Sequence, residues 1–189
     1  SADAGGYRGG VRTRVTAAVL SGMLVLGLAG CTQPEPAEPT PTTAFSSDEE
    51  AFAAAEETYR AYVDALNQVD LSDPETFEAV YGWTTGEANA EARKTFSKMH
   101  ADGWTVSGVS IATEVEPRLA GDGESGDIVL AVCLDVANVA LVDGGGNSMV
   151  SADRPDVQSM LVSLEPSMAT DTGMAIGQFS GRDGEPQCE

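Results

Sequence analysis

Basic side chains are scarce in this sequence. Lys and Arg account for 10 of its 189 residues and Asp and Glu for 30, so the formal net charge is −20. Proteins that bind nucleic acid derive much of their affinity from Lys and Arg that neutralise phosphates, and anionic lipid head groups attract the same side chains. We therefore expect no nucleic-acid partner and no adsorption of the folded surface to anionic lipid.

Histidine is rarer still, because His100 is the single one. A histidine metal cluster cannot form, and the His–Cys spacings of zinc sites are absent. The chain also lacks a P-loop, a dinucleotide-binding glycine motif and a Gly-x-Ser-x-Gly nucleophile motif. The sequence therefore predicts no metal, no cofactor and no recognisable catalytic residue, and we expect His100 at the end of a helix.

Aromatic residues make up 6% of the chain, and the hydrophobic fraction of 42% is slightly below the usual range of about 45–50%. The length fits a single domain. A light core built from Val, Leu, Ala and a few rings is expected.

Long hydrophobic runs are also missing. The apolar stretch Val15–Leu28 is interrupted by glycines and is shorter than the roughly 20 residues that span a membrane. It follows Arg8, Arg12 and Arg14, and a basic segment before a short apolar core is typical of a secretory signal peptide, here residues 1–30. A buried core helix is the alternative, which the glycines disfavour. The arginines are not adjacent, so the general secretory route is expected.

The signal ends in Leu28-Ala29-Gly30-Cys31, which resembles the lipobox of bacterial lipoproteins. The resemblance implies that the Cys31 thiol receives a diacylglyceryl group and that cleavage follows Gly30. Two or more acyl chains anchor a protein stably, whereas one does so only marginally. The implied location is extracytoplasmic, on the outer face of the cytoplasmic membrane, with the lipid anchor at Cys31 as the membrane contact.

Residues 31–46 follow as a proline-rich tether. Its prolines remove backbone donors and fix φ, so neither helix nor sheet is expected there. Such a segment is extended and semi-rigid, and it should hold an acidic domain of residues 47–189 clear of the bilayer. A ligand for a proline-binding partner is the alternative interpretation.

Three helices are predicted after the tether. Ser47 to Glu50 form a capping-box pattern, and the apolar stripe that follows predicts a helix over about 48–67. Asp73-Pro74 is a second start signal, for a short helix that Gly82 ends. A third helix is predicted over about 87–100.

From Trp104 onward the apolar period changes to two, which predicts strands. They are expected over Trp104 to near Pro117, Ile128–Val136, Gln158–Leu164 and Ala175–Ser180, with turns at Ala120–Gly126 and Gly144–Gly146. Helices followed by antiparallel strands predict an α+β fold in which one curved four-stranded sheet wraps around the first helix.

Two cysteines remain if Cys31 is lipidated. An even pair in an exported domain indicates a disulfide, so Cys133 and Cys188 are expected to be joined. Two free buried thiols are the alternative.

The order of elements resembles the cone-shaped NTF2-like superfamily, which includes SnoaL-type and ketosteroid-isomerase-type domains, over Ser47–Cys188. The segment from Val132 to Leu164 and the terminal Gly-Glu-Pro-Gln-Cys are also similar to small exported domains of actinobacterial lipoproteins. That second likeness is carried by Cys133, Asp135, Gly144–Gly146, Arg154-Pro155 and Cys188.

In an NTF2-like cone, a pocket would be faced by Tyr59, Tyr62, Tyr81 and Trp104. In ketosteroid-isomerase-type domains a tyrosine hydroxyl and carboxylic acids perform catalysis in such a pocket. Core packing is the alternative role for these rings. Asp135 is expected to form a structural ion pair with Arg154, with a ligand site as the alternative.

Two functions of different class follow. The favoured one is a non-catalytic binding module of the cell envelope for a small apolar ligand or a protein partner. The other is a small cofactor-free isomerase or cyclase with a tyrosine and a carboxylate in its pocket. An inert structural domain is a third reading.

Overall fold

The computed structural model describes residues 45–118 and 127–188. The signal peptide, Cys31, nearly all of the tether and the predicted turn at Ala120–Gly126 lie outside the described residues. The elements run in the order α1 (Asp48–Leu66), η1 (Pro74–Thr76), α2 (Phe77–Gly82), α3 (Gly86–Ala101), β1 (Thr105–Ser107), β2 (Ile111–Arg118), β3 (Ile128–Asp135), β4 (Ala140–Val142), β5 (Val157–Pro166) and β6 (Met174–Gly181). The α+β class is confirmed.

The start of α1 agrees with its capping signal. The Ser47 hydroxyl accepts a hydrogen bond from the backbone N–H of Glu50 at 3.2 Å. The Glu50 carboxylate does not close a full capping box, because it accepts from the backbone N–H of Ser46 instead, at 2.9 Å. Either way an otherwise unpaired amide near the helix start gains an acceptor.

The second start signal opens a tighter turn than predicted. The Asp73 carboxylate accepts from the backbone N–H of Glu75 at 3.1 Å, and Pro74 begins the 3₁₀ turn η1. This turn leads directly into α2, so the expected short helix is present in two parts. The third helix, α3, matches the sequence pattern to within about a residue at each end.

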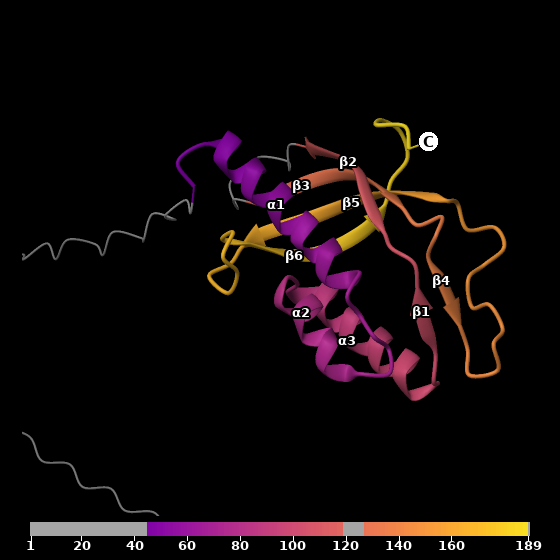
Figure 1. Cartoon of the computed structure of the whole chain (residues 1–189). Coiled ribbons are helices and arrows are strands. Elements are labelled where there is room, and N and C mark those ends of the chain that lie inside the picture. Colours follow the sequence, from indigo (N-terminus) through magenta and orange to yellow (C-terminus); the bar gives the residue numbers. More distant parts are fainter. Residues whose placement is uncertain (1–44, 119–126, 189) are drawn as a thin grey trace, which may run out of the picture. The chain divides into compact units, whose positions relative to one another are not determined.

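Four strands form one antiparallel sheet in the order β2-β3-β5-β6. Alternate side chains of β3, including Leu130 and Val132, point to α1 and join the main core with Tyr59 and Val63. Figure 1 shows α1 lying across this sheet. Because Ala131 and Cys133 on the other face are buried as well, β3 has little polar alternation.

A second sheet was not expected. The predicted strand from Trp104 to Pro117 is two strands, and β1 pairs with β4 rather than with the main sheet. The break lies at Gly108, whose φ is +84°, a conformation that turns the chain and that L-residues avoid. Figure 1 shows the β1–β4 pair extending from the sheet beside α3.

The division of strands is accompanied by a second core. Leu71, Phe77 and Tyr81 are buried together at the end of the domain that α2, α3 and β1 build. Trp104 and Phe96 pack against them, half-buried. The aromatic residues are therefore divided between the two cores.

The predicted disulfide is confirmed. Cys133 on β3 is joined to Cys188, with their Cα atoms 5.4 Å apart. The bond fastens the C-terminal tail to the central part of the sheet. Among the described residues, no helix is both long and apolar enough to cross a bilayer.

Candidate functional site

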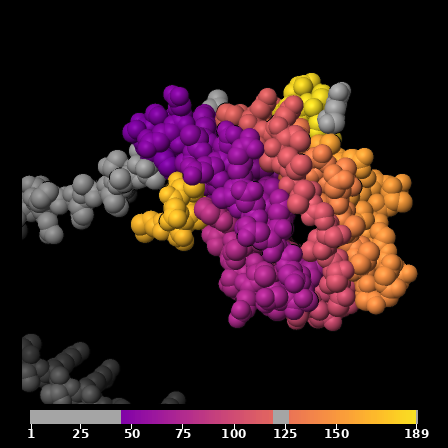
Figure 2. All heavy atoms as spheres, viewed as in Figure 1, coloured from indigo at the N-terminus to yellow at the C-terminus, as the bar shows by residue number. Residues whose placement is uncertain are grey.

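An apolar pocket of about 180 Å³ lies between the end of α1, the loop after it, α3 and the β1–β4 pair. The space-filling view shows an opening between the purple helical segments and the salmon segment that links β1 to β2 (Figure 2). Apart from Gly108 and the polar residues Asn67 and Ser110, the lining is apolar: Leu66, Val69, Leu71, Phe96, Met99, Val106, Val139 and Leu141. The pocket therefore offers an occupant dispersion contacts and the removal of apolar surface from water.

Asn67 fixes one wall of the pocket. Its side-chain amide donates to the carbonyl of Ser110 at 2.9 Å, and its carbonyl oxygen accepts from the Ser110 N–H at 2.8 Å. This pair of bonds resembles the contact that a neighbouring strand would make. It ties the C-terminal end of α1 to the segment between β1 and β2, and it engages the Asn67 amide within the protein.

Gly108 makes a second tight contact in the same segment. A Cβ atom at this position would lie 1.9 Å from the carbonyl oxygen of Asn138 and 3.2 Å from the Cα of Val139. The backbone between β1 and β2 therefore touches the backbone before β4, at a separation that only glycine permits. These two tight contacts, at Asn67 and Gly108, hold the opening in shape.

A ring cluster supports the floor of the pocket. Phe77 stacks on Phe96 with ring centroids 5.2 Å apart, and Phe96 lines the pocket. Nδ1 of His100 lies 2.8 Å from the carbonyl oxygen of Leu71, so a proton on Nδ1 makes a hydrogen bond that ties the loop to α3. His100 does lie in the last turn of a helix, as expected from the sequence, and it serves this loop.

An exposed carboxylate lies in the loop that contributes to the pocket lining. Asp70 lies between two pocket residues, Val69 and Leu71, and its own side chain is exposed. Hydrogen bonds from Ser72 lower the pKa of the Asp70 carboxyl, so it is ionised at neutral pH. The pocket lining is therefore uncharged, and the loop that supplies Val69 and Leu71 also carries an ionised carboxylate.

Tyr59 and Tyr62 are core residues of α1. Their ring centroids are 6.3 Å apart, and Tyr62 also contacts Phe179 of β6 at 5.3 Å. Burial raises the pKa of Tyr62 to about 12 and raises that of Tyr59 as well. The Tyr59 hydroxyl makes no hydrogen bond to a carboxylate among the described residues. The hydroxyl-plus-carboxylate arrangement of an isomerase is not assembled at Tyr59.

The Tyr59 hydroxyl is buried and has no hydrogen-bond partner in the described part of the chain. Tyr59→Phe removes an unsatisfied polar group, so we expect the free energy of unfolding to stay equal or to rise, by up to about 1 kcal/mol. The measurement is urea denaturation of both proteins at neutral pH.

Thr58→Val is the matched control for this prediction. Thr58 is fully buried beside Tyr59, but its hydroxyl donates to the carbonyl of Ala54 at 2.7 Å and also bonds Thr172. Its removal is expected to cost about 1–2 kcal/mol, because the Thr172 hydroxyl then loses a partner. A larger loss for Tyr59→Phe than for Thr58→Val would contradict the interpretation.

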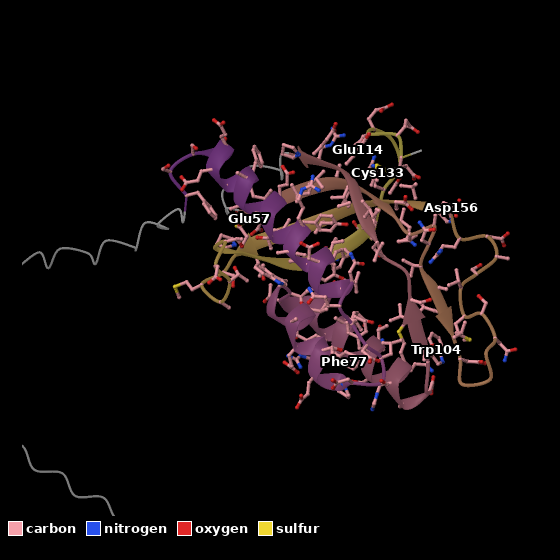
Figure 3. All side chains as sticks on the ribbon, in the orientation of Figure 1. Glu57, Phe77, Trp104, Glu114, Cys133 and Asp156 are labelled. Atoms are coloured by element: carbon pink, nitrogen blue, oxygen red, sulfur yellow. A yellow bond between two sulfur atoms is a disulfide. The ribbon has the colours of Figure 1, made fainter. Side chains whose placement is uncertain are left out.

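Tyr81 and Trp104 lie in the other core. The guanidinium of Arg93 stacks over the Tyr81 ring at 4.1 Å, and the Lys98 ammonium lies 5.9 Å from the Trp104 ring. The structure thus does not bring the four expected rings to one cavity, and none of them lines the pocket described above. Figure 3 shows Trp104 near Phe77 at the end of the domain away from Cys133.

Asp135 and Arg154 do not form the expected ion pair among the described residues. The Arg154 guanidinium instead donates to the carbonyls of Val136 and Val139, at 2.7 and 3.0 Å. The Asp135 carboxylate accepts from the backbone N–H of Ala137 at 2.9 Å. Both side chains make hydrogen bonds to backbone groups of the loop after β3. Neither side chain needs the other as a partner.

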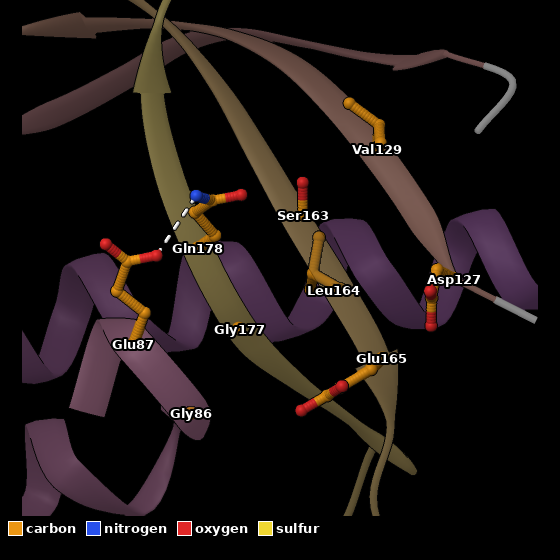
Figure 4. Close-up of a pocket in the computed structure, with 9 residues that line it drawn as sticks. All are labelled: Gly86, Glu87, Asp127, Val129, Ser163, Leu164, Glu165, Gly177 and Gln178. Carbon is orange, nitrogen blue, oxygen red and sulfur yellow. Dashed lines mark hydrogen bonds between the residues drawn. The ribbon is translucent and has the colours of Figure 1, made fainter. Parts of the chain in front are cut away.

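A wider hollow of about 470 Å³ lies on the sheet face opposite α1. Figure 4 shows its lining at the start of α3 and on β3, β5 and β6, where Gln178 donates to Glu87 at 3.1 Å. Glu165 and Asp127 also line it. No group of three or more potential metal ligands occurs in the part of the chain that the structure describes.

The sequence did not single out Asn67, Gly108 or Ser110. Gly108 within an apolar alternating segment was the available signal, since an internal glycine in a strand often marks a bend or a close backbone approach. From the sequence, Asn67 could be identified only as the residue at the end of the first predicted helix. Its partner Ser110 lies 43 residues further along the chain, so no local pattern indicates their contact.

No protein-family model matches the chain, and no curated protein sequence is detectably similar to it. Among solved structures, the intermembrane space region of the chloroplast protein ARC6 matches with a TM-score of 0.45 and 11% identity, covering 68% of this chain and 94% of that one. The periplasmic domain of DotI matches at 0.36 and 15%, covering 74% and 98%. A periplasmic fragment of TraM matches at 0.35 and 14%, covering 74% and 100%. These low values assign neither a fold family nor a function.

Proposed function

We propose that this chain is an exported lipoprotein whose domain is a non-catalytic binding module of the cell envelope. Its ligand is one small apolar group, held in the pocket between α1, α3 and the β1–β4 pair. The observation that carries the proposal is the apolar lining of a pocket whose polar wall residue, Asn67, is engaged by Ser110. The Cys133–Cys188 disulfide supports an oxidising, extracytoplasmic compartment.

The volume of the pocket limits the size of the ligand that it can hold. Sites for drug-sized molecules enclose about 300–1,000 Å³, whereas an apolar cavity of about 150 Å³ accepts benzene. At about 180 Å³, the pocket fits one ring or one branched aliphatic group. A single side chain of a protein partner, or a ligand of that size, is therefore the proposed occupant.

The NTF2-like fold and the likeness to actinobacterial lipoproteins belong to this proposal. The order of three helices before the strands supports the proposed NTF2-like fold. The separate β1–β4 sheet is a departure from the single sheet expected of the cone.

Toluene is a suitable probe of the pocket. We expect saturable changes in the NMR signals of methyl groups that line it, such as those of Val106 and Leu141, with a Kd on the order of 1 mM. Val106→Phe should abolish these changes, because the added ring occupies the space that the probe would take.

Val109→Phe provides the matched control. Val109 is 49% exposed and is not part of the pocket lining, so toluene binding should persist. Both variants should first be shown to unfold cooperatively in urea. Toluene shifts that are absent from the wild-type protein, or that survive Val106→Phe, would refute the proposed binding site.

The lipid anchor is tested separately. In a bacterial host that processes lipoproteins, Cys31→Ser should either leave the precursor uncleaved or release the processed protein from the membrane, because no thiol remains to receive the diacylglyceryl group. The check is partition into a detergent phase together with the mass of the mature N-terminus. Continued detergent partitioning of a processed Ser variant would contradict lipidation at Cys31.

A further inference from the structure

The Cys133–Cys188 disulfide has a cation beside it. Nη2 of Arg182 lies 3.2 Å from Sγ of Cys188 and 3.7 Å from Sγ of Cys133. The other terminal nitrogen of the guanidinium donates to the carbonyl of Gly184 at 2.6 Å. Arg182 therefore directs one edge of its guanidinium at both sulfur atoms, and a neutral disulfide is a weak acceptor for it.

This guanidinium lacks the partner that such a group usually has. Within the described ranges Arg182 forms no ion pair, and its buried Nε makes no hydrogen bond. Partly buried charges are normally paired, and an unsatisfied group calls for a physical reason. A thiolate at either sulfur would supply the missing negative charge.

The two sulfur atoms differ in their surroundings. Cys133 is 1% exposed, whereas Cys188 is partly accessible. The Glu114 carboxylate, on the neighbouring strand, lies 3.9 Å from Sγ of Cys133 (Figure 3). An external thiol can therefore reach Cys188 more easily than Cys133. Cys133 is then the sulfur that leaves, and the Arg182 guanidinium, 3.7 Å from it, offsets the negative charge of Glu114 on the same sulfur.

We propose that Cys133–Cys188 is an exchange-active disulfide that accepts electrons from an external dithiol, with Arg182 stabilising the thiolate that leaves. A thiolate of the dithiol attacks Sγ of Cys188, the bond to Cys133 breaks, and its electron pair stays on Sγ of Cys133 beside the guanidinium. The second thiol of the dithiol loses its proton to solvent and attacks the mixed disulfide, releasing Cys188. The dithiol is oxidised by two electrons and the cystine is reduced by two.

Reduction would free the C-terminal tail. Besides the disulfide, the described hydrogen bonds that tie residues 182–188 to other strands run from the Arg182 N–H to the carbonyl of Ser159 on β5 and from the Arg118 guanidinium to the carbonyl of Glu185. Release of Cys188 would uncover the face of β3 around Cys133, which the folded protein buries. The proposed redox site is independent of the apolar pocket, which has no residue in common with it.

The experiment measures the rate at which dithiothreitol reduces the oxidised wild-type chain, followed by alkylation and mass spectrometry. Arg182→Gln should slow reduction about tenfold, because the leaving thiolate loses its stabilising charge and leaves with a higher pKa. Arg182→Lys should retain most of the rate. Arg118→Gln is the matched control, since Arg118 holds the same tail but does not contact the sulfurs, and its rate should be unchanged.

An Arg182→Gln protein that is reduced as fast as the wild type would overturn the proposal, and so would an equal slowing by Arg118→Gln. A second measurement needs the wild-type chain alone, namely the pH dependence of iodoacetamide alkylation after reduction. One thiol should titrate below the ordinary pKa of about 8.5. If both thiols titrate near that ordinary value, the disulfide is structural only. The same conclusion holds if the chain unfolds on reduction and both thiols therefore titrate normally.

Discussion

Replacing Cys133 by Ala and Cys188 by Ser is expected to lower the free energy of unfolding by about 4 kcal/mol. The disulfide joins residues 55 positions apart, and in the chain-entropy model a cross-link of this length removes that much conformational freedom from the unfolded state. Domains are typically stable by about 5–15 kcal/mol, so the loss is a large fraction of the total. Urea denaturation with the midpoint and slope of each protein is the measurement.

The control uses the reductant. Dithiothreitol should destabilise the wild-type protein by an amount similar to the double substitution, and it should leave the double variant unchanged. Each single substitution should have nearly the full effect, because either one prevents the bond. A double variant within about 1 kcal/mol of the wild type would show that the cross-link contributes little to folding.

Among the glycines that the structure describes, Gly108 is expected to be the one where substitution by Ala is most damaging, with a loss of about 3 kcal/mol or more in the free energy of unfolding. The residue has a φ of +84°, which costs an L-residue about 1–2 kcal/mol. In addition, the new Cβ would lie 1.9 Å from the carbonyl oxygen of Asn138, so the backbone between β1 and β2 and the backbone before β4 must separate. Because Gly108 lines the pocket, toluene binding should weaken in the same variant.

Gly146→Ala isolates the conformational cost from the close approach. Gly146 has nearly the same φ, +81°, but its Cβ would meet no atom within 4 Å. It should therefore lose only the conformational cost of about 1–2 kcal/mol, with toluene binding retained. Equal losses for Gly108→Ala and Gly146→Ala would show that the close approach to Asn138 is not a constraint in solution.

Local signals predicted most of the helices and strands. The Ser47 cap and the apolar stripe of α1 act over one turn at a time, so the sequence alone could place that helix to within a residue or two. The alternating residues of β3 and the turn at Gly144–Gly146 were also predictable, because both depend on residues that are close together in the chain. The disulfide was predictable from the number of cysteines together with the predicted export of the domain.

The errors arose where partners distant in the chain decide the outcome. The segment from Trp104 to Pro117 has one continuous apolar alternation, yet β1 pairs with β4 and β2 with β3, because the contact of Gly108 with Asn138 bends the chain between them. Arg154 likewise donates to the backbone carbonyls of Val136 and Val139 and not to the expected carboxylate of Asp135. A local pattern of residues does not show which of several distant strands or acceptors a segment will pair with.

The sequence by itself determined the acidic character of the chain, the α+β order of its elements, the pairing of Cys133 with Cys188, and the likeness to lipoproteins around Cys31. Each depends on composition or on neighbours along the chain. Only the tertiary structure decided where a pocket forms and which cation faces the disulfide. The pocket needs Asn67 beside Ser110, and the redox site needs Arg182 beside Cys133, which are 43 and 49 positions apart. Such contacts depend on how the helices and strands pack, which no periodicity in the sequence encodes.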